Sequence, residues 1–282
     1  MKESEKNALQ IAACKVRMGV IEGVHGAKSG HPGGSLSAAE IFTYLYFREM
    51  RNLDPKNPKA ENRDRFVLSK GHTCPGLYAA LALKGYFPEE ELKKLRHTGA
   101  LLQGHPDMRT IPGVDMSTGS LGQGVSAACG MALAGKLDGK PYRVYSLLGD
   151  GEVDEGQVWE AAMFAAHHKL DNLCLIIDSN GLQIDGPVEE VAGPGPIDEK
   201  YRAFGFDVQT IDGHDFDAIE AAFEHAKTVK GKPSAIVAKT VKGKGVSYME
   251  NQVGWHGKAP NDEQYQVAMR ELNAVLSGLE AE

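Results

Sequence analysis

The sequence predicts one α/β domain built on a doubly wound, mostly parallel sheet with helices on both faces. Short apolar runs alternate with amphipathic segments through the second half of the chain. This alternation is typical of parallel strands joined by crossover helices. The runs 143–148 and 173–178 are apolar along most of their length, which indicates strands that are covered on both faces.

The length and charge of the chain limit the class of protein. Its 282 residues suffice for one large domain, and no repeat or clear linker divides them, so we expect a single domain over 1–282. A net charge of −7 without long basic runs argues against nucleic acid as a partner. The charged start is unlike a signal peptide, and no apolar run approaches the roughly 20 residues of a membrane span. These features favour a cytoplasmic protein with no membrane partner.

The first half of the chain is predicted to be mainly helical. Apolar residues at helical spacing predict helices over 4–22, 37–47, 76–84, 89–96 and 125–137. Ser37 and Glu40 have the spacing of a capping box at the start of the second helix. One short apolar run, 66–68, is a predicted strand, and the segments 25–34 and 101–115 are predicted loops.

The second half supplies the remaining strands. They are predicted over 143–148, 173–178, 206–211 and 234–239, with helices over 156–169, 198–204, 216–229 and 262–279. We expect His214 to be structural and the lysine- and glycine-rich segment 242–245 to be a mobile, solvated loop. The four cysteines lack CxxC spacing and are expected to be buried thiols.

Two polar residues follow neighbouring predicted strands. Asp150 lies between Gly149 and Gly151 after the strand 143–148, and Asn180 follows the strand 173–178. Ligands bind at the carboxyl ends of strands in open parallel sheets, and carboxylate and amide oxygens suit magnesium and its phosphate partners. The pair therefore predicts a metal–diphosphate site. For Gly-Asp-Gly taken alone, an aspartate that caps the next helix is the simpler interpretation, and Asn180 is what favours a site.

These motifs, in their order along the chain, resemble the transketolase family, and specifically its diphosphate-binding domain. The resemblance covers nearly the whole chain. It is carried by Gly149-Asp150-Gly151 with Asn180 and by five further segments, which are Ser29-Gly30-His31-Pro32-Gly33, Leu68-Ser69-Lys70-Gly71-His72, Gly104-His105-Pro106, Thr118-Gly119-Ser120-Leu121-Gly122-Gln123-Gly124 and Trp255-His256-Gly257.

The resemblance implies a role for each matching position. The metal, Mg²⁺ with Ca²⁺ or Mn²⁺ as substitutes, is expected on the side chains of Asp150 and Asn180 and the carbonyl of Leu182. The catalytic acid–base residues are expected to be His31, His72, His105 and His256. Contacts with thiamine diphosphate are expected from His72, Gly119, Ser120, Leu121, Gly149, Asp150, Gly151, Glu155, Asn180 and His256. From the residues alone, a helix-to-helix turn is the simpler interpretation of His31, and an exposed loop histidine is an equally acceptable interpretation of His72.

The resemblance also exposes what the chain does not contain. Family members carry a pyrimidine-binding domain and a smaller C-terminal domain, and no segment of this sequence could form them. Either the chain is a fragment or the enzyme is divided between two polypeptides. We predict the second case, in which this N-terminal subunit homodimerises within an α2β2 heterotetramer with a transketolase C-terminal subunit.

The implied activity is transfer of a two-carbon ketol unit from a ketose phosphate to an aldose phosphate. Related alternatives are a deoxyxylulose-phosphate synthase, a component of a 2-oxo acid dehydrogenase and a transketolase that acts on sulfonated sugars. From a different class, the chain could be a non-catalytic, cofactor-binding scaffold subunit. The four matching histidines favour an enzyme over a scaffold, because a scaffold has no use for them.

Overall fold

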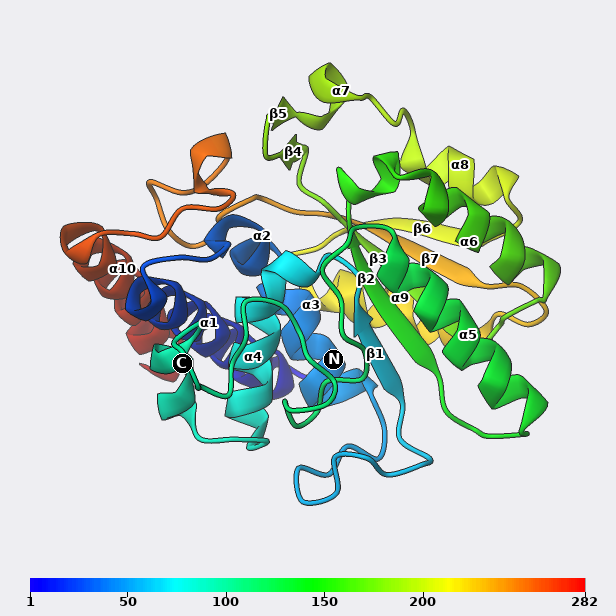
Figure 1. Ribbon diagram of the computed structural model, residues 1–282, viewed down its shortest axis with the longest axis horizontal. Helices are drawn as coiled ribbons and strands as arrows, with labels where there is room; N and C mark the ends of the chain where they lie inside the picture. The colour runs from blue at the N-terminus through cyan, green and yellow to red at the C-terminus, as the bar shows by residue number, and fades with distance from the viewer. Residues whose placement is uncertain (282) are drawn as a thin grey trace.

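The computed structural model describes residues 1–281 and is built around a five-stranded sheet (Figure 1). The strands lie in the order β1 (Arg65–Leu68), β2 (Val144–Gly149), β3 (Leu173–Ser179), β7 (Ser234–Lys239) and β6 (Asp207–Asp212). Every neighbouring pair in this sheet is parallel. The predicted parallel α/β class is therefore confirmed.

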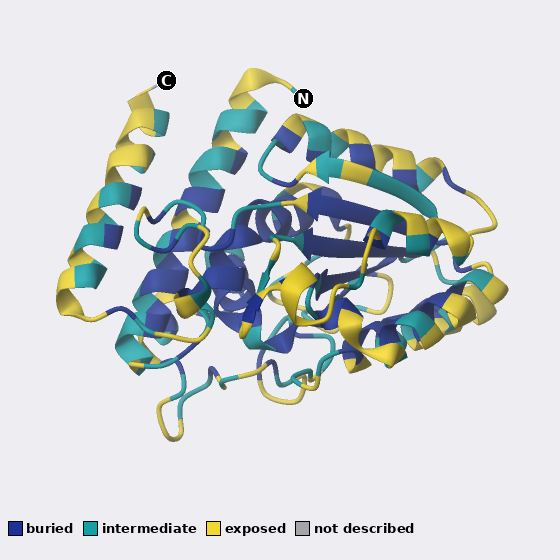
Figure 2. Cartoon of the chain, turned by 90° about the horizontal axis from the view of Figure 1, so that it is seen from above, coloured by how far each residue is buried: buried dark blue, intermediate teal, exposed yellow. Residues whose placement is uncertain are grey.

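Helices cover both faces of the sheet and bury alternate residues of each strand. One core lies under α1 (Glu3–Ala27), α3 (Ala39–Tyr44), α4 (Cys74–Lys84) and α9 (Phe216–Thr228) and receives Tyr145 and Leu147 of β2. The other lies under α5 (Gln123–Leu137), α6 (Gly156–His167) and α8 (Ile197–Ala203) and receives Val144 and Leu148. The central strands are consequently buried along most of their length (Figure 2).

The C-terminal helix α10 (Asp262–Ala281) packs along α1 at the edge of the molecule (Figure 1). The ring of Tyr265 stacks on His25 with 4.1 Å between centroids. The remaining short elements are α2 (Pro32–Ser37), η1 (Leu45–Glu49), η2 (Gly71–Thr73), η3 (Glu89–Lys94), η4 (Glu152–Asp154), β4 (Leu182–Gln183), β5 (Gly186–Pro187), α7 (Val188–Val191) and η5 (Val253–Trp255). Within residues 1–281, no helix combines the length and apolar character that crossing a bilayer requires.

The predicted helix 37–47 is wrong in its start and its regularity. Helix formation begins earlier, at Pro32, whose fixed φ suits a first helical position. The segment then continues as α3 and ends in the π-helical turn η1. Ser37 is not a cap, because its Oγ donates to the Gly34 carbonyl and to Asp178. Glu40 is instead buried against Arg17 and His214.

The structure also decides three smaller expectations. The predicted helix 89–96 is a 3-10 segment, and Arg96, just beyond it, has a left-handed φ of 62°. All four cysteines are buried and unpaired, as expected for residues that pack as small apolar side chains. His214 joins two elements, because its ring contacts Glu40 and accepts a bond from the Val241 amide.

Candidate cofactor site

The loops that follow β1, β2 and β3 meet at the carboxyl ends of these strands and enclose a cavity of about 280 Å³. We call this the cofactor cavity. Such a position is the usual ligand site of an open parallel sheet. Its lining residues are His31, Gly34, Lys70, His72, Gly119, Leu121, Gly149, Asp150, Gly151, Glu152, Asn180, Leu182, Gln183, Ile184, Lys242 and His256.

The three predicted metal ligands are brought together in this cavity. Asp150 is buried, and its carboxylate accepts bonds from the amides of Gly151 at 3.0 Å and Gly181 at 2.5 Å. Burial and, secondarily, the charge of Asp178 raise the pKa of Asp150 to about 6. In residues 1–281 no group of three or more His, Cys, Asp or Glu side chains is arranged to hold a metal. An ion here would therefore need the amide and carbonyl oxygens of Asn180 and Leu182, which are hard ligands of the magnesium type.

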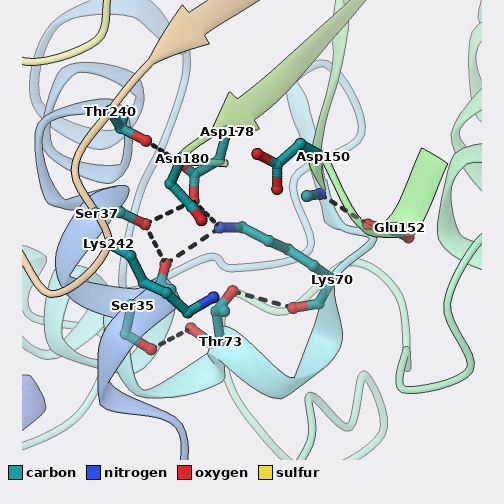
Figure 3. Close-up of polar contacts among 12 residues, drawn as sticks. Ser35, Ser37, Lys70, Thr73, Asp150, Glu152, Asp178, Asn180, Thr240 and Lys242 are labelled. Carbon is teal, nitrogen blue, oxygen red and sulfur yellow. Dashed lines mark hydrogen bonds and ion pairs between the residues drawn. The ribbon is translucent and has the colours of Figure 1, made fainter. Parts of the chain in front are cut away.

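A buried ion pair lies directly beneath these ligands (Figure 3). Nζ of Lys70 is 2.5 Å from Oδ2 of Asp178, which also accepts from Ser37 and from the Asn180 amide nitrogen. Thr240 donates to the other oxygen. Burial alone would raise the pKa of Asp178, but the charge and hydrogen bond of Lys70 hold it below its usual value. Because Asp178 takes the nitrogen of the Asn180 amide, it fixes which way that amide points.

Three of the four predicted histidines form one cluster. The ring centroids of His31, His72 and His256 are 5.1 to 5.6 Å apart, and all three line the cofactor cavity. Burial lowers the pKa of His31 to about 4 and that of His256 to about 3, and it also lowers the pKa of His72. The rings are therefore neutral near pH 7, and each offers one donor and one acceptor nitrogen.

His105 lies in an adjoining cavity of about 580 Å³, and Gly119 lines both this cavity and the cofactor cavity. A Cβ on Gly119 would meet the His105 ring at 3.3 Å. The predicted contact residue Ser120 lines this second cavity, whereas Leu121 lines the first. Burial, followed by the charge of Arg96, lowers the pKa of His105.

Arg96 ties together the two loops that carry Gly-His-Pro. Its guanidinium donates to Ser29 Oγ at 2.8 Å and to the Gly104 carbonyl at 3.3 Å. The Gly104 carbonyl also accepts from Cys74 Sγ at 3.2 Å. These contacts fix the loop on which His105 is presented.

The predicted environment of Lys242 is wrong. The segment 242–245 was expected to be solvated, but Lys242 is buried and its Nζ donates to the Leu182 carbonyl at 2.8 Å. Burial lowers the pKa of Lys242 to about 8. With Lys70, it gives the cavity two cationic side chains that could hold a diphosphate. The Lys-Gly repeat was the only sequence signal for this role.

The glutamate that lines the cofactor cavity is Glu152 and not the predicted Glu155. Glu155, the predicted contact, is exposed at the start of α6 and does not line the cofactor cavity. Glu152, three positions earlier, is buried and lines it. The sequence shows both glutamates, but only the fold of η4 turns Glu152 inward. The contact of Glu155 with thiamine diphosphate stays a prediction.

The donors of the cofactor cavity fit a metal–diphosphate group. Hard oxygen ligands lie next to two ammonium groups and three neutral imidazoles, and Gly34, Gly149 and Gly151 keep the wall free of side chains. A larger open cavity of about 710 Å³ lies on the other side of Asp150 and Asn180, but its lining contains none of the predicted histidines. The smaller cavity, which the predicted histidines line, is therefore the candidate site.

This fold, with such a set of donors at the carboxyl ends of its strands, is typical of a diphosphate-binding α/β domain. The chain belongs to the transketolase family, since residues 8–274 match the family profile described as "Transketolase, thiamine diphosphate binding domain". It is 51% identical over 264 residues to a 6-deoxy-6-sulfo-D-fructose transketolase subunit of Clostridium sp. strain MSTE9, covering 94% of this chain and 96% of that one. It is 43% identical over 274 residues to one subunit of the apulose-4-phosphate transketolase of Phocaeicola vulgatus, covering 97% of each chain.

Longer transketolases match over a smaller part of their length. Rat transketolase is 46% identical over 259 residues, which are 91% of this chain and 40% of that one. The crystal structure of the Campylobacter jejuni transketolase superposes with a TM-score of 0.88 at 35% identity, covering 99% of this chain and 46% of that one. The chain thus spans less than half of these two proteins and nearly all of the two named subunits.

Proposed function

We propose that this chain is the N-terminal subunit of a split transketolase that transfers a two-carbon ketol unit from a ketose phosphate to an aldose phosphate. The observation that carries the proposal is the cofactor cavity, in which Asp150, Asn180 and Leu182 lie beside three neutral histidines. When bound, thiamine diphosphate supplies the nucleophilic carbon and electron sink that such a reaction requires.

The residues of the chain itself have distinct tasks in this proposal. Asp150, Asn180 and the Leu182 carbonyl hold a magnesium ion, and Lys242 with the ring N–H of His72 holds the diphosphate. His31 and His256, which are neutral, take a proton from a substrate hydroxyl or give one to a substrate oxygen. Their partial burial supports this role, because it limits the access of bulk water to the protons that they exchange.

We further propose that a partner chain supplies the pyrimidine-binding and C-terminal domains. The naming of similar proteins as transketolase subunits supports a partner. A second copy of this chain would pack on the groove between α5 and α6, which is lined in part by Cys129, Gly130, Ala161 and Phe164. Phe164, an apolar side chain of this lining, is 39% exposed. Two such chains and two partners would form the α2β2 assembly.

A ketose that carries a sulfonate instead of a phosphate is the second candidate for the substrate. The observation that favours it is the 51% identity to a subunit named for a sulfonated fructose. Assay of the assembled enzyme with both classes of ketose would decide between them. We expect the residues that bind the phosphate or sulfonate group of the sugar to lie on the partner.

The test of the proposal is calorimetric titration of the assembled complex with thiamine diphosphate in the presence and absence of Mg²⁺. We expect magnesium-dependent uptake that Asp150→Ala abolishes and that Asp154→Ala, a change at a nearby exposed carboxylate, leaves intact. Uptake by Asp150→Ala equal to that of the wild type would overturn the proposed site. Full ketol transfer by the purified chain without a partner would overturn the split arrangement.

A further inference from the structure

Glu152 is a buried carboxylate at the wall of the cofactor cavity that has no place in the chemistry described above. It is 2% exposed. Its Oε1 accepts from Ser69 Oγ at 2.6 Å and from the Gly122 amide at 2.9 Å, and its Oε2 accepts from the Gly149 amide at 3.1 Å. Figure 3 shows the side chain beside Asp150, turned toward the backbone. Both oxygens are therefore used by protein donors.

These donors come from three separate segments of the chain. Ser69 follows β1, Gly122 precedes α5, and Gly149 ends β2. Each segment also contributes to the lining of the cofactor cavity, through Lys70 and His72, through Gly119 and Leu121, and through Asp150. One carboxylate thus sets the relative position of the segments from which the cavity is built.

The same contacts supply the cap that α5 otherwise lacks. Its N-cap residue is Gly122, which has a left-handed φ of 78° and no side chain to satisfy the first amides of the helix. Ser69 Oγ accepts from the Val125 amide at 3.1 Å while it donates to Glu152. Glu152 and Ser69 together cap the helix from two other segments, which holds Gly119 and Leu121 at its start.

We propose that Glu152 is a positioning residue of the cofactor site, acting through Ser69, Gly122 and Gly149 to hold the cavity in the shape that binds thiamine diphosphate. This inference rests on the proposed function. An ionised carboxylate only accepts hydrogen bonds, as all three contacts require. Glutamine has nearly the same shape, but it would turn its NH₂ group toward an N–H or O–H donor, so the cavity should be disturbed even by this conservative change.

The test compares Glu152→Gln with the wild type in the assembled complex at saturating Mg²⁺. We expect the Kd for thiamine diphosphate, measured by calorimetry, to rise by roughly ten-fold or more, as the loss of a charge-assisted contact with a buried donor predicts. At saturating cofactor, kcat should stay within about two-fold of the wild type, because the reacting groups are unchanged.

Glu49→Gln is the matched control. Glu49 is also buried, accepts from Tyr145 and Lys227, and does not line the cofactor cavity. It should lose stability to chemical denaturation without a change in the Kd for the cofactor. A change in Kd that is equal in both variants would reduce Glu152 to a general structural role and overturn the proposal.

Ser69→Ala is a second, milder variant for the case in which Glu152→Gln does not fold. It removes one donor of the network, and we expect a smaller rise in the same Kd. A wild-type Kd in whichever of the two variants folds overturns the positioning role while the proposed function stands. Absence of cofactor uptake by the wild-type complex would overturn the proposed function itself, so the two failures are distinguishable.

Discussion

Nζ of Lys70 lies 2.5 Å from Oδ2 of Asp178, and both side chains are almost completely buried. The pair joins the end of β1 to the end of β3 and lies beneath the predicted metal ligands. Further hydrogen bonds satisfy both side chains. Lys70 also donates to the Gly34 carbonyl, and Asp178 also accepts from Ser37 and Thr240. Removing one partner would leave the other charge without compensation inside the protein.

Asp178→Asn should therefore lower the free energy of unfolding by about 3–5 kcal/mol. Urea denaturation followed by circular dichroism would measure the change. The control is Asp217→Asn, which alters an ion pair with Lys6 at the surface and should leave the denaturation midpoint nearly unchanged. Equal effects of the two substitutions would mean that the buried pair contributes no more to the free energy of unfolding than a surface pair does.

The stability of the fold should depend on pH through the partly buried His256. The folded chain holds His256 at a pKa of about 3, whereas the unfolded chain restores the ordinary value near 6.5. Below pH 6.5 the imidazole of His256 is protonated in the unfolded chain but not in the folded chain. The contribution of His256 to folding stability is therefore complete above pH 6.5 and is lost as the pH falls toward 3.

His256→Asn should consequently lose less stability than the wild type between pH 7 and pH 5. The raised pKa of Asp150 has the opposite effect on folding stability over part of this range, because the folded chain binds this proton more readily than the unfolded chain does. The comparison with His256→Asn therefore isolates the effect of His256. The denaturant midpoint of both proteins at several pH values provides the measurement, with the exposed His225→Asn as a control for loss of an imidazole. Parallel pH profiles for wild type and His256→Asn would contradict the prediction.

His105→Ala should separate an enzyme from a scaffold. His105 lies in the adjoining cavity and not in the cofactor cavity, so the variant should bind thiamine diphosphate almost normally. We expect kcat for ketol transfer to fall by roughly 100- to 10,000-fold, the usual contribution of a general acid or base. A scaffold subunit would show no change in the activity of the assembled complex.

Gly122→Ala should disturb both the start of α5 and the cofactor cavity. Gly122 has φ of 78°, and an added Cβ would lie 2.9 Å from Cβ of Glu155. Gly139→Ala is the matched control, because Gly139 has φ of 61° and no atom within 4 Å of an added Cβ. The control should lose about 1–2 kcal/mol of stability from backbone strain alone.

The greater loss expected for Gly122→Ala comes from the additional contact with Glu155. Its affinity for thiamine diphosphate should also fall, whereas that of Gly139→Ala should not. Thermal unfolding and calorimetry would measure the two effects. Identical losses in the two variants would show that only the left-handed backbone matters at Gly122.

The sheet and the proximity of Asp150 and Asn180 could be predicted from the sequence because both depend on local patterns. Apolar runs such as 173–178 mark buried strands, and the parallel arrangement brings the residues after them to one edge. Asp150 and Asn180 follow neighbouring strands, so the rule was sufficient to place them together.

The residues beneath the site could not be predicted in this way. Lys70 and Asp178 are 108 positions apart, and nothing in either local sequence indicates the other. Glu152 and Glu155 look alike as acidic residues before a helix, and only the 3-10 turn η4 decides which one is buried. Lys242 was missed because its burial results from contact with the distant Leu182 loop.

The bond from Lys242 Nζ to the Leu182 carbonyl has a consequence for the order in which the site fills. The oxygen that would coordinate a divalent ion is already engaged by an ammonium group, so an ion that arrives alone competes with a tethered cation. An ion that arrives with a diphosphate brings a new acceptor to which the lysine can turn. Ion and organic cofactor should therefore load cooperatively, each raising the affinity of the chain for the other.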